Sequence, residues 1–295
     1  MILVLGDINL DIIVNLREDI NFNTDSESDI HFEGGGSAAN FSYWLDYLEQ
    51  PVRFVAKTGG DFIVDYLKKQ FQNTKIDFIN LVSKNKETGR IVILLSKSGD
   101  RTMVTDRGAN LDFSPEDITN DYFKGIEHLH LGGYSFFGGK NMEETSIKTI
   151  KKAKQNNIKV SFDPSSYSGL NSYGTQNILN QTKGVDFCFP NIDEGRVLAN
   201  EEDPEKIVHV LLNYYKNVVL KLGEEGCYIG NQDFIKKIKQ KRKLADGDTT
   251  GAGDAFTAAF LADYLNNGIL QSAAEKANEV AFKCVKKIGG RPPEL

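Results

Sequence analysis

Residues 248–256 of the chain read DTTGAGDAF, a run with the composition of an anion-binding turn followed by a helix. Gly251 and Gly253 leave the backbone open enough for its amides to approach an anion, and the alanine-rich segment after them predicts a helix. Because a helix N-terminus favours negative charge, a phosphate is the expected guest. Asp254 would repel that phosphate unless it had a chemical task, such as accepting a proton from an attacking hydroxyl. The alternative is an aspartate that only stabilises the first helical turn.

All nine residues of this run resemble the C-terminal signature of the PfkB, or ribokinase-like, carbohydrate kinases. The resemblance implies transfer of the γ-phosphoryl group of ATP to a hydroxyl, with Mg²⁺ on the phosphates. In that scheme Asp254 is the catalytic base. The backbone amides of Gly251, Ala252 and Gly253 then stabilise charge on the transferring group.

Length and charge narrow the class of protein. A chain of 295 residues is long enough for one large α/β domain, and two equal domains are less expected. Acidic residues outnumber basic ones by 41 to 35, which argues against nucleic acid or an anionic membrane as the main partner. No apolar run approaches the roughly 18 residues of a membrane span, and there is no basic leader. We therefore expect a soluble, cytoplasmic protein.

The three cysteines, Cys188, Cys227 and Cys284, are far apart and lack the spacing of metal ligands. We expect them to be reduced, buried thiols.

Short β-like runs alternate with helical patterns through most of the chain, which predicts a largely parallel sheet with helices on both faces. In such sheets ligands bind beyond the carboxyl ends of the strands. The expected strands are Ile2–Leu5, Arg53–Ala56, His128–Leu131, Lys159–Phe162, Phe187–Phe189 and Asn217–Lys221, and the expected helices are Ala38–Leu48, Asp61–Gln72, Met142–Gln155 and Asp254–Asn266.

Two segments interrupt this alternation. Residues 12–33 are polar and irregular, and residues 88–107 contain a hairpin pattern around Ser98, Gly99 and Asp100. They are either surface excursions or, as the family resemblance implies, a small β-sheet lid that often also pairs subunits. We therefore expect one kinase domain over residues 1–295, an α/β/α sandwich of three layers with a small β-sheet lid, and a homodimer formed through that lid.

Residues 34–40 read GGGSAAN and precede an amphipathic helical pattern. A flexible loop before a helix is one explanation. The run also resembles the first PfkB signature, which implies that Gly35 and Gly36 form a lid hinge touching the substrate and that Asn40 contacts the substrate. After the first strand, Asp11 matches an aspartate that accepts hydrogen bonds from sugar hydroxyls, and Asn9 is expected to assist it.

The nucleotide side is expected from three further segments. Asn191 and Glu194 have the spacing of a capping box, and they also match a family motif whose glutamate places Mg²⁺ through water. The loop Lys221–Gly226, with Gly223 and Gly226, resembles the family's nucleotide loop at a strand end, although a plain turn is the alternative. Asp248 and Thr250 match positions that bind a monovalent cation, such as K⁺, in many relatives.

Some positions depart from the family pattern, and other nucleotide-binding schemes do not apply. The run Asp163–Ser166 lacks the Asn and Arg that often follow this aspartate, so we do not expect phosphate contacts from it. The run Gly59–Asp61 follows the usual Gly-Asp-Asp pattern imperfectly. There is no Gly-x-Gly-x-x-Gly fingerprint, residues 133–140 miss the P-loop spacing, and the protein-kinase motifs are absent.

The acceptor is expected to be a nucleoside, phosphorylated at its 5′-hydroxyl. Ribokinase-like sequences often have a lysine inside the glycine motif, whereas this chain has Ser37, as in archaeal-type nucleoside kinases. Ribose, fructose and 2-keto-3-deoxygluconate remain alternatives, because Arg90, Arg101 and Arg107 lie in the lid region and a sugar acid would need a cation. A non-catalytic sugar-binding regulator and a lidless vitamin kinase are less favoured, since the base, the anion turn and the hairpin are all present.

Overall fold

The computed structural model describes residues 1–96, 101–242, 248–287 and 289–293. Within them one sheet has nine strands, parallel except at β12 and β13, in the order β13-β12-β11-β10-β9-β8-β1-β4-β5. These strands are β1 (Ile2–Leu5), β4 (Val52–Thr58), β5 (Asp77–Val82), β8 (His128–Gly132), β9 (Lys159–Asp163), β10 (Phe187–Cys188), β11 (Asn217–Lys221), β12 (Cys227–Gly230) and β13 (Ile235–Ile238). Every strand expected from the sequence is present.

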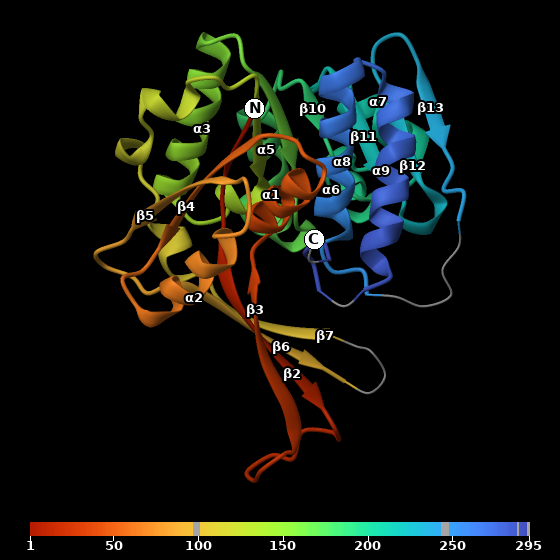
Figure 1. The fold of residues 1–295 in the computed structure, drawn as a ribbon. Helices are drawn as coiled ribbons and strands as arrows, with labels where there is room; N and C mark the ends of the chain where they lie inside the picture. The colour runs from red at the N-terminus through yellow and green to blue at the C-terminus, as the bar shows by residue number, and fades with distance from the viewer. Residues whose placement is uncertain (97–100, 243–247, 288, 294–295) are drawn as a thin grey trace.

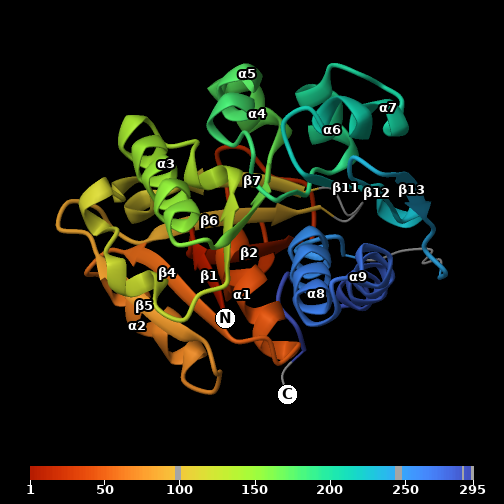
Figure 2. The ribbon, with the colours of Figure 1, turned by 90° about the horizontal axis from the view of Figure 1, so that it is seen from above.

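Helices cover both faces of this sheet, so the predicted layered fold is confirmed (Figure 2). One face carries α1 (Ser37–Tyr47), α2 (Phe62–Phe71), α8 (Ala252–Asn267) and α9 (Leu270–Val285). The other carries α3 (Lys140–Gln155), α4 (Tyr167–Tyr173), α5 (Thr175–Gln181), α6 (Ile192–Ala199) and α7 (Pro204–Leu211). Two apolar layers result because the strands are buried on both sides. None of the described helices is long and apolar enough to cross a bilayer.

Helix α8 packs against α1 and α9 through small residues. Ala255, Ala258 and Ala259 are fully or almost fully buried, which lets the helices approach closely. The helix begins at Ala252, two residues earlier than the sequence predicts, and it ends at Gly268, whose φ is 73°. All three cysteines are buried and free, as expected.

The described residues also form a second sheet, which has four strands and projects from the layered body (Figure 1). We call it the lid sheet. Its strands are β2 (Asn9–Leu16), β3 (Ser28–Gly35), β6 (Gly89–Leu95) and β7 (Arg101–Asp106), in the order β3-β2-β6-β7. The segment that looks irregular in sequence thus contains most of β2 and β3. The hairpin of β6 and β7 is present as predicted, and its tip, with Ser98, Gly99 and Asp100, lies outside the described residues.

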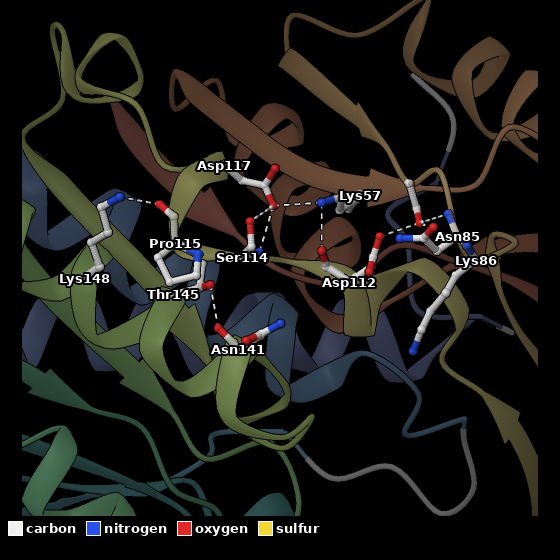
Figure 3. Close-up of polar contacts among 11 residues, drawn as sticks. Lys57, Asn85, Lys86, Asp112, Ser114, Pro115, Asp117, Asn141, Thr145 and Lys148 are labelled. Atoms are coloured by element: carbon white, nitrogen blue, oxygen red, sulfur yellow. Dashed lines mark hydrogen bonds and ion pairs between the residues drawn. The ribbon is translucent and has the colours of Figure 1, made fainter.

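A polar cluster fixes the segment that returns from the lid sheet to the body (Figure 3). The buried Lys57, near the end of β4, donates through Nζ to the carbonyl oxygen of Asp112 at 2.7 Å and to Oδ2 of Asp117 at 2.8 Å. The hydroxyl of Ser83, just after β5, donates to Oδ2 of Asp112 at 2.5 Å. The base of the lid sheet is therefore tied to the ends of two core strands.

Candidate active site

The turn before α8 has the geometry of an anion-binding helix start. Gly251 precedes the first helical residue with φ of 69°, a left-handed conformation that favours glycine. A Cβ atom at Gly251 would lie 2.5 Å from the backbone of Gly290, so the turn has no room for a side chain. In this conformation the amide of Ala252 donates to the carbonyl oxygen of Thr249 at 3.2 Å.

Asp254 is the third residue of α8, but its side chain caps no backbone amide there. Its Oδ1 instead accepts a hydrogen bond from the hydroxyl of Ser37, the first residue of α1, at 2.7 Å. Asp254 thus lies in the first turn of α8, as the alternative requires, and also contacts a second helix. A hydroxyl already lies against the carboxylate.

A buried ion pair stands beside this turn. Nζ of Lys221, at the end of β11, lies 2.7 Å from Oδ2 of Asp163, at the end of β9. The hydroxyl of Thr257 in α8 donates to the same oxygen at 3.0 Å. Lys221 also lies against the anion turn, because a Cβ atom on Gly253 would be 3.5 Å from its Nζ. The positive charge thus faces both the buried aspartate and the helix start.

The carboxylates around Lys221 are held in an environment that disfavours their charge. Burial raises the pKa of Asp254 to about 8, with the Ser37 hydroxyl opposing the shift and the charge of Asp163 adding to it. Burial alone would lower the pKa of Lys221, but Asp163 and Glu194 outweigh it and raise that pKa. The lysine therefore stays charged. Any further positive charge in the site would stabilise the ionised forms of Asp254 and Glu194.

Asn191 and Glu194 form the capping box that the sequence predicts. The side chain of Asn191 accepts from the amide of Glu194 at 2.9 Å, and Glu194 Oε2 accepts from the amide of Asn191 at 2.8 Å. Glu194 is only 2% exposed, and burial raises its pKa to about 7. Its role toward Mg²⁺ stays a prediction.

The surroundings of Glu194 fit a metal held mainly by substrate. Among the described residues no group of three or more His, Cys, Asp or Glu side chains could hold a metal ion. Mg²⁺ in nucleotide sites keeps several waters and binds phosphates through one or two carboxylates. A single carboxylate at this place is consistent with that arrangement.

A cavity of about 730 Å³ opens beside the anion turn. Its polar wall includes all four residues expected to bind nucleotide, namely Asn191, Lys221, Gly223 and Gly226, together with Ala252 and Gly253 of the turn. Its apolar wall includes Phe256, Ala281, Phe282 and Val285. A cavity with an apolar end and a charged end matches the shape of a nucleotide.

Asp7 holds the start of α1, next to the glycine motif. The sequence assigned this aspartate no role. Its two carboxylate oxygens accept from the amides of Ser37 and Ala38 at 3.1 and 3.2 Å. Gly36 has φ of 101°, and a Cβ atom there would lie 2.6 Å from the carbonyl oxygen of Asp7. Asp7 therefore sets where α1 begins and where the Ser37 hydroxyl points.

Two unpaired oxygen atoms mark the acceptor side. Oδ1 of Asp11 and Oδ1 of Asn40 are buried without a hydrogen-bond partner. Gly35 lies directly against Asp11, since a Cβ atom on this glycine would be 2.1 Å from Oδ2 of the carboxylate. Burial raises the pKa of Asp11 to about 7, and the charge of Arg291 opposes the shift. Unpaired buried acceptors carry a desolvation cost that hydroxyl donors of a ligand would relieve.

Asn9 is buried and already hydrogen-bonded within the protein. Its Oδ1 accepts from Nδ2 of Asn110 at 2.8 Å, and Asn110 Oδ1 accepts from the amide of Ile8 at 3.0 Å. This network supports the start of β2. The contact of Asn9 with substrate stays a prediction.

The three arginines of the lid region have different surroundings. Arg90 pairs with Glu87 and Asp106 on the lid surface. Arg107 turns inward, donating to the carbonyl oxygen of Tyr134 at 2.6 Å with its guanidinium 5.5 Å from the centre of that ring. Burial lowers the pKa of Arg107, and the charge of Asp7 opposes this. Arg107 is thus a partly buried cation that donates to the carbonyl oxygens of Tyr134 and Phe137, a position that the sequence did not show.

Asp248 and Thr250, expected to hold a monovalent cation, contact each other and an arginine of the lid sheet. Oδ1 of Asp248 accepts from the amide of Thr250 at 2.8 Å, from its hydroxyl at 2.5 Å and from the guanidinium of Arg101. Oδ2 accepts from the amide of Gly289 at 2.8 Å. Oδ1 thus accepts from three donors, one of them a cationic side chain, whereas Oδ2 accepts from one, and the role of Asp248 and Thr250 toward K⁺ stays a prediction.

The raised pKa of Asp254 predicts a pH-dependent gain in stability for Asp254→Asn. Native Asp254 holds its proton up to about pH 8, whereas the unfolded chain releases it near 3.8, so the free energy of unfolding falls as pH rises between these values. Asparagine does not ionise, so the free energy of unfolding of the variant lacks this dependence on pH. Thermal unfolding should show equal stability near pH 4 and a variant several degrees more stable at pH 9. The exposed Asp233→Asn variant is the control, and a gain independent of pH would contradict the assignment.

Comparison with known proteins identifies the family. A family model described as pfkB family carbohydrate kinase matches residues 1–295. An uncharacterized sugar kinase of Archaeoglobus fulgidus is 28% identical over 84% of this chain and 96% of its own length. An ATP-dependent ribose-1-phosphate kinase of Halopiger xanaduensis is 25% identical, over 98% of this chain and 93% of its own.

Solved structures agree on the fold. The crystal structure of adenosine kinase from Sinorhizobium meliloti superimposes with a TM-score of 0.88 at 22% identity, covering 99% of this chain and 95% of its own. The chain therefore belongs to the pfkB family of carbohydrate kinases and is a ribokinase-like phosphotransferase that acts on an alcohol group.

Proposed function

We propose that this protein transfers the γ-phosphoryl group of ATP to a primary hydroxyl of a sugar-containing small molecule, with the 5′-hydroxyl of a nucleoside as the first candidate. The observation that carries the proposal is the hydroxyl of Ser37, held 2.7 Å from the Asp254 carboxylate at the start of α8. An acceptor hydroxyl bound at the same carboxylate would be placed for proton transfer. The name of the Halopiger relative supports ATP as the donor.

In this mechanism most of the work is positioning. Asp254 accepts the proton of the acceptor hydroxyl while the oxygen attacks the γ-phosphorus and the bond to the β-phosphate oxygen breaks, releasing ADP. The amides of Gly251 and Gly253 and the charge of Lys221 would stabilise the transferring group, and the amide of Ala252, which donates to Thr249 in the free protein, would join them if the turn adjusts to the phosphate. Mg²⁺, when bound, neutralises charge on the phosphates, and Glu194 would orient its water shell.

The acceptor would lie between the lid sheet and the anion turn. Asp11 and Asn40 offer unpaired oxygens to two of its hydroxyls, and Gly35 and Gly36 allow close approach of the backbone. A nucleoside suits Ser37, since no lysine stands in the glycine motif. Closure of the lid sheet over the acceptor would exclude water, which otherwise competes as nucleophile.

Release of ADP tests the proposal directly. The purified protein with ATP and Mg²⁺ is offered nucleosides, ribose, fructose, 2-keto-3-deoxygluconate and phosphorylated sugars, and we expect the highest kcat/KM with a nucleoside. Asp254→Asn should lower kcat by about 10² to 10⁴ while calorimetry shows similar acceptor affinity. Asp233→Asn serves as the control. ADP release from no acceptor would favour a sugar-binding regulator instead, and full activity of Asp254→Asn would sink the role of the base.

An anionic acceptor is the second candidate, and Arg107 is the observation that favours it. Its inward guanidinium would pair with a carboxylate or phosphate on the acceptor. If so, Arg107→Met should lower kcat/KM for the anionic acceptor by about 10- to 100-fold, the usual effect of a charged hydrogen bond. The same variant with a neutral nucleoside is the internal control. An equal loss with both acceptors would indicate a structural role for Arg107.

We also propose that two chains associate through the outer face of the lid sheet. Asp11, Ile13 and Ile93 lie on its inner face, where Ile13 and Ile93 are buried. Paired residues of neighbouring strands share a face, so the outer face carries a continuous apolar row of Phe32, Ile12, Val92 and Val104. Phe32 is 56% and Val104 60% exposed. An apolar row of this kind is typical of an interface.

Light scattering at micromolar concentration should give the mass of a dimer. Replacing both Phe32 and Val104 by Ser should shift the protein to monomers, because the row loses its apolar ends. Ile269→Ser, which removes another exposed apolar side chain away from the lid, should leave the mass unchanged. A monomeric native protein would refute the interface.

A further inference from the structure

An ion pair links the lid sheet to the anion turn. Arg101 is the first residue of β7, at the edge of the lid sheet, and its Nη2 donates to Oδ1 of Asp248. The two side chains are only 27% and 13% exposed. Asp248 stands three residues before Gly251 in the chain. This contact therefore joins two elements that are otherwise distant in sequence and lie on opposite sides of the acceptor space.

The Arg101–Asp248 pair places a positive charge beside a partly buried carboxylate of the anion turn. Without Arg101 the carboxylate of Asp248 would keep only the donors of Thr250 and Gly289 and would have no cationic partner. Burial alone would raise the pKa of Asp248, but the donors from Thr250 and Gly289 and the charge of Arg101 outweigh it and lower that pKa. A guanidinium stays charged at any accessible pH and offers a rigid set of donors. Arg101 thus keeps Asp248 ionised and its turn fixed.

We propose that the guanidinium of Arg101 takes the place of a monovalent cation at Asp248, so that the lid sheet itself supplies the positive charge that holds the anion turn. The guanidinium lies at Oδ1 of this carboxylate, which also accepts from the amide and hydroxyl of Thr250, so the positive charge of a cation is already supplied there. Arg101 is a positioning residue, because it acts on the phosphates through the Asp248 turn. The role of Arg101 in holding the turn does not depend on which acceptor is phosphorylated. Only its effect on the rate of transfer rests on the proposed function.

Two expected results distinguish an arginine at Asp248 from a bound ion. The protein should bind nucleotide equally well in K⁺ and in a bulky cation that cannot enter the site. Nucleotide affinity should also depend on Arg101, although this residue does not line the nucleotide cavity. A site that takes K⁺ from solution would bind nucleotide more tightly in K⁺ than in the bulky cation, and its nucleotide affinity would not depend on Arg101.

The experiment compares the full-length protein with Arg101→Met, Arg101→Lys and Arg90→Met. Thermal unfolding and binding of a non-hydrolysable ATP analogue are measured in about 0.1 M KCl and in equal tetramethylammonium chloride. Native protein should give the same Tm and the same affinity in both salts. Arg101→Met should bind the analogue about tenfold more weakly in tetramethylammonium, the effect of one lost charge-assisted hydrogen bond.

Potassium should then rescue this variant. With the guanidinium gone, K⁺ can reach the Asp248 carboxylate, so KCl should restore analogue affinity and raise the Tm of Arg101→Met, as any ligand of the native state does. Arg101→Lys keeps the charge and should resemble native protein. Arg90→Met removes a lid arginine that pairs only within the lid region and should change neither quantity.

Three results would overturn the proposal. One is a native Tm or affinity that rises in K⁺, since the site would then take an ion. The second is an Arg101→Met variant indistinguishable from native protein in both salts. The third is a loss in Arg101→Met that K⁺ does not reverse. These readouts need no acceptor, so they are independent of the proposed function, which fails only if no acceptor supports ADP release.

Discussion

One buried lysine governs the chemistry of the site. Lys221 is the positive charge closest to the buried carboxylate of Asp163, and it offsets part of the cost of burying Glu194 and Asp254. Even with this lysine, burial keeps the pKa of Asp254 at about 8 and that of Glu194 at about 7, so Asp254 needs further positive charge in the site to act as a base at neutral pH. The remaining deficit of positive charge is one that the metal-bound nucleotide of the proposed function would offset. Its low local dielectric makes each such charge count more than it would in water.

The order of the sheet explains how these groups meet. Asp163, Asn191 and Lys221 stand at or just after the ends of β9, β10 and β11, which are neighbours in the sheet and run parallel. Residues 58 apart in the chain thus come within 2.7 Å without any local signal that joins them. The N-terminus of α8 lies over this edge and adds the anion turn. The site is consequently built on rigid elements, while the lid sheet contributes Asp11 and Arg101 from the opposite side.

Much of the fold and part of the site could be predicted from the sequence. Strand and helix periodicity is local, and so is the run DTTGAGDAF, which is why the layered architecture and the position of Asp254 at a helix start agree with prediction. Ser37, Asp7 and Arg107 were not assigned, because each acts through a contact with a distant segment. Gly6-Asp7 after the first strand was the only available hint for Asp7. The pairing of Asp248 with Arg101 depends on the packing of the lid, which no spacing within the chain encodes.

The segment Gly289–Arg291, though far from the motif in sequence, completes the site. Gly290 packs against Gly251, its carbonyl oxygen accepts from Nε1 of the buried Trp44 at 2.8 Å, and Gly289 donates to Asp248. During synthesis this segment leaves the ribosome after every strand and helix described above. The layers can pack earlier, but the anion turn lacks its supporting wall until then. A chain interrupted before Gly289 would thus keep most of its core and still lack the wall behind the turn at Gly251, so this part of the candidate site is completed late in the making of the molecule.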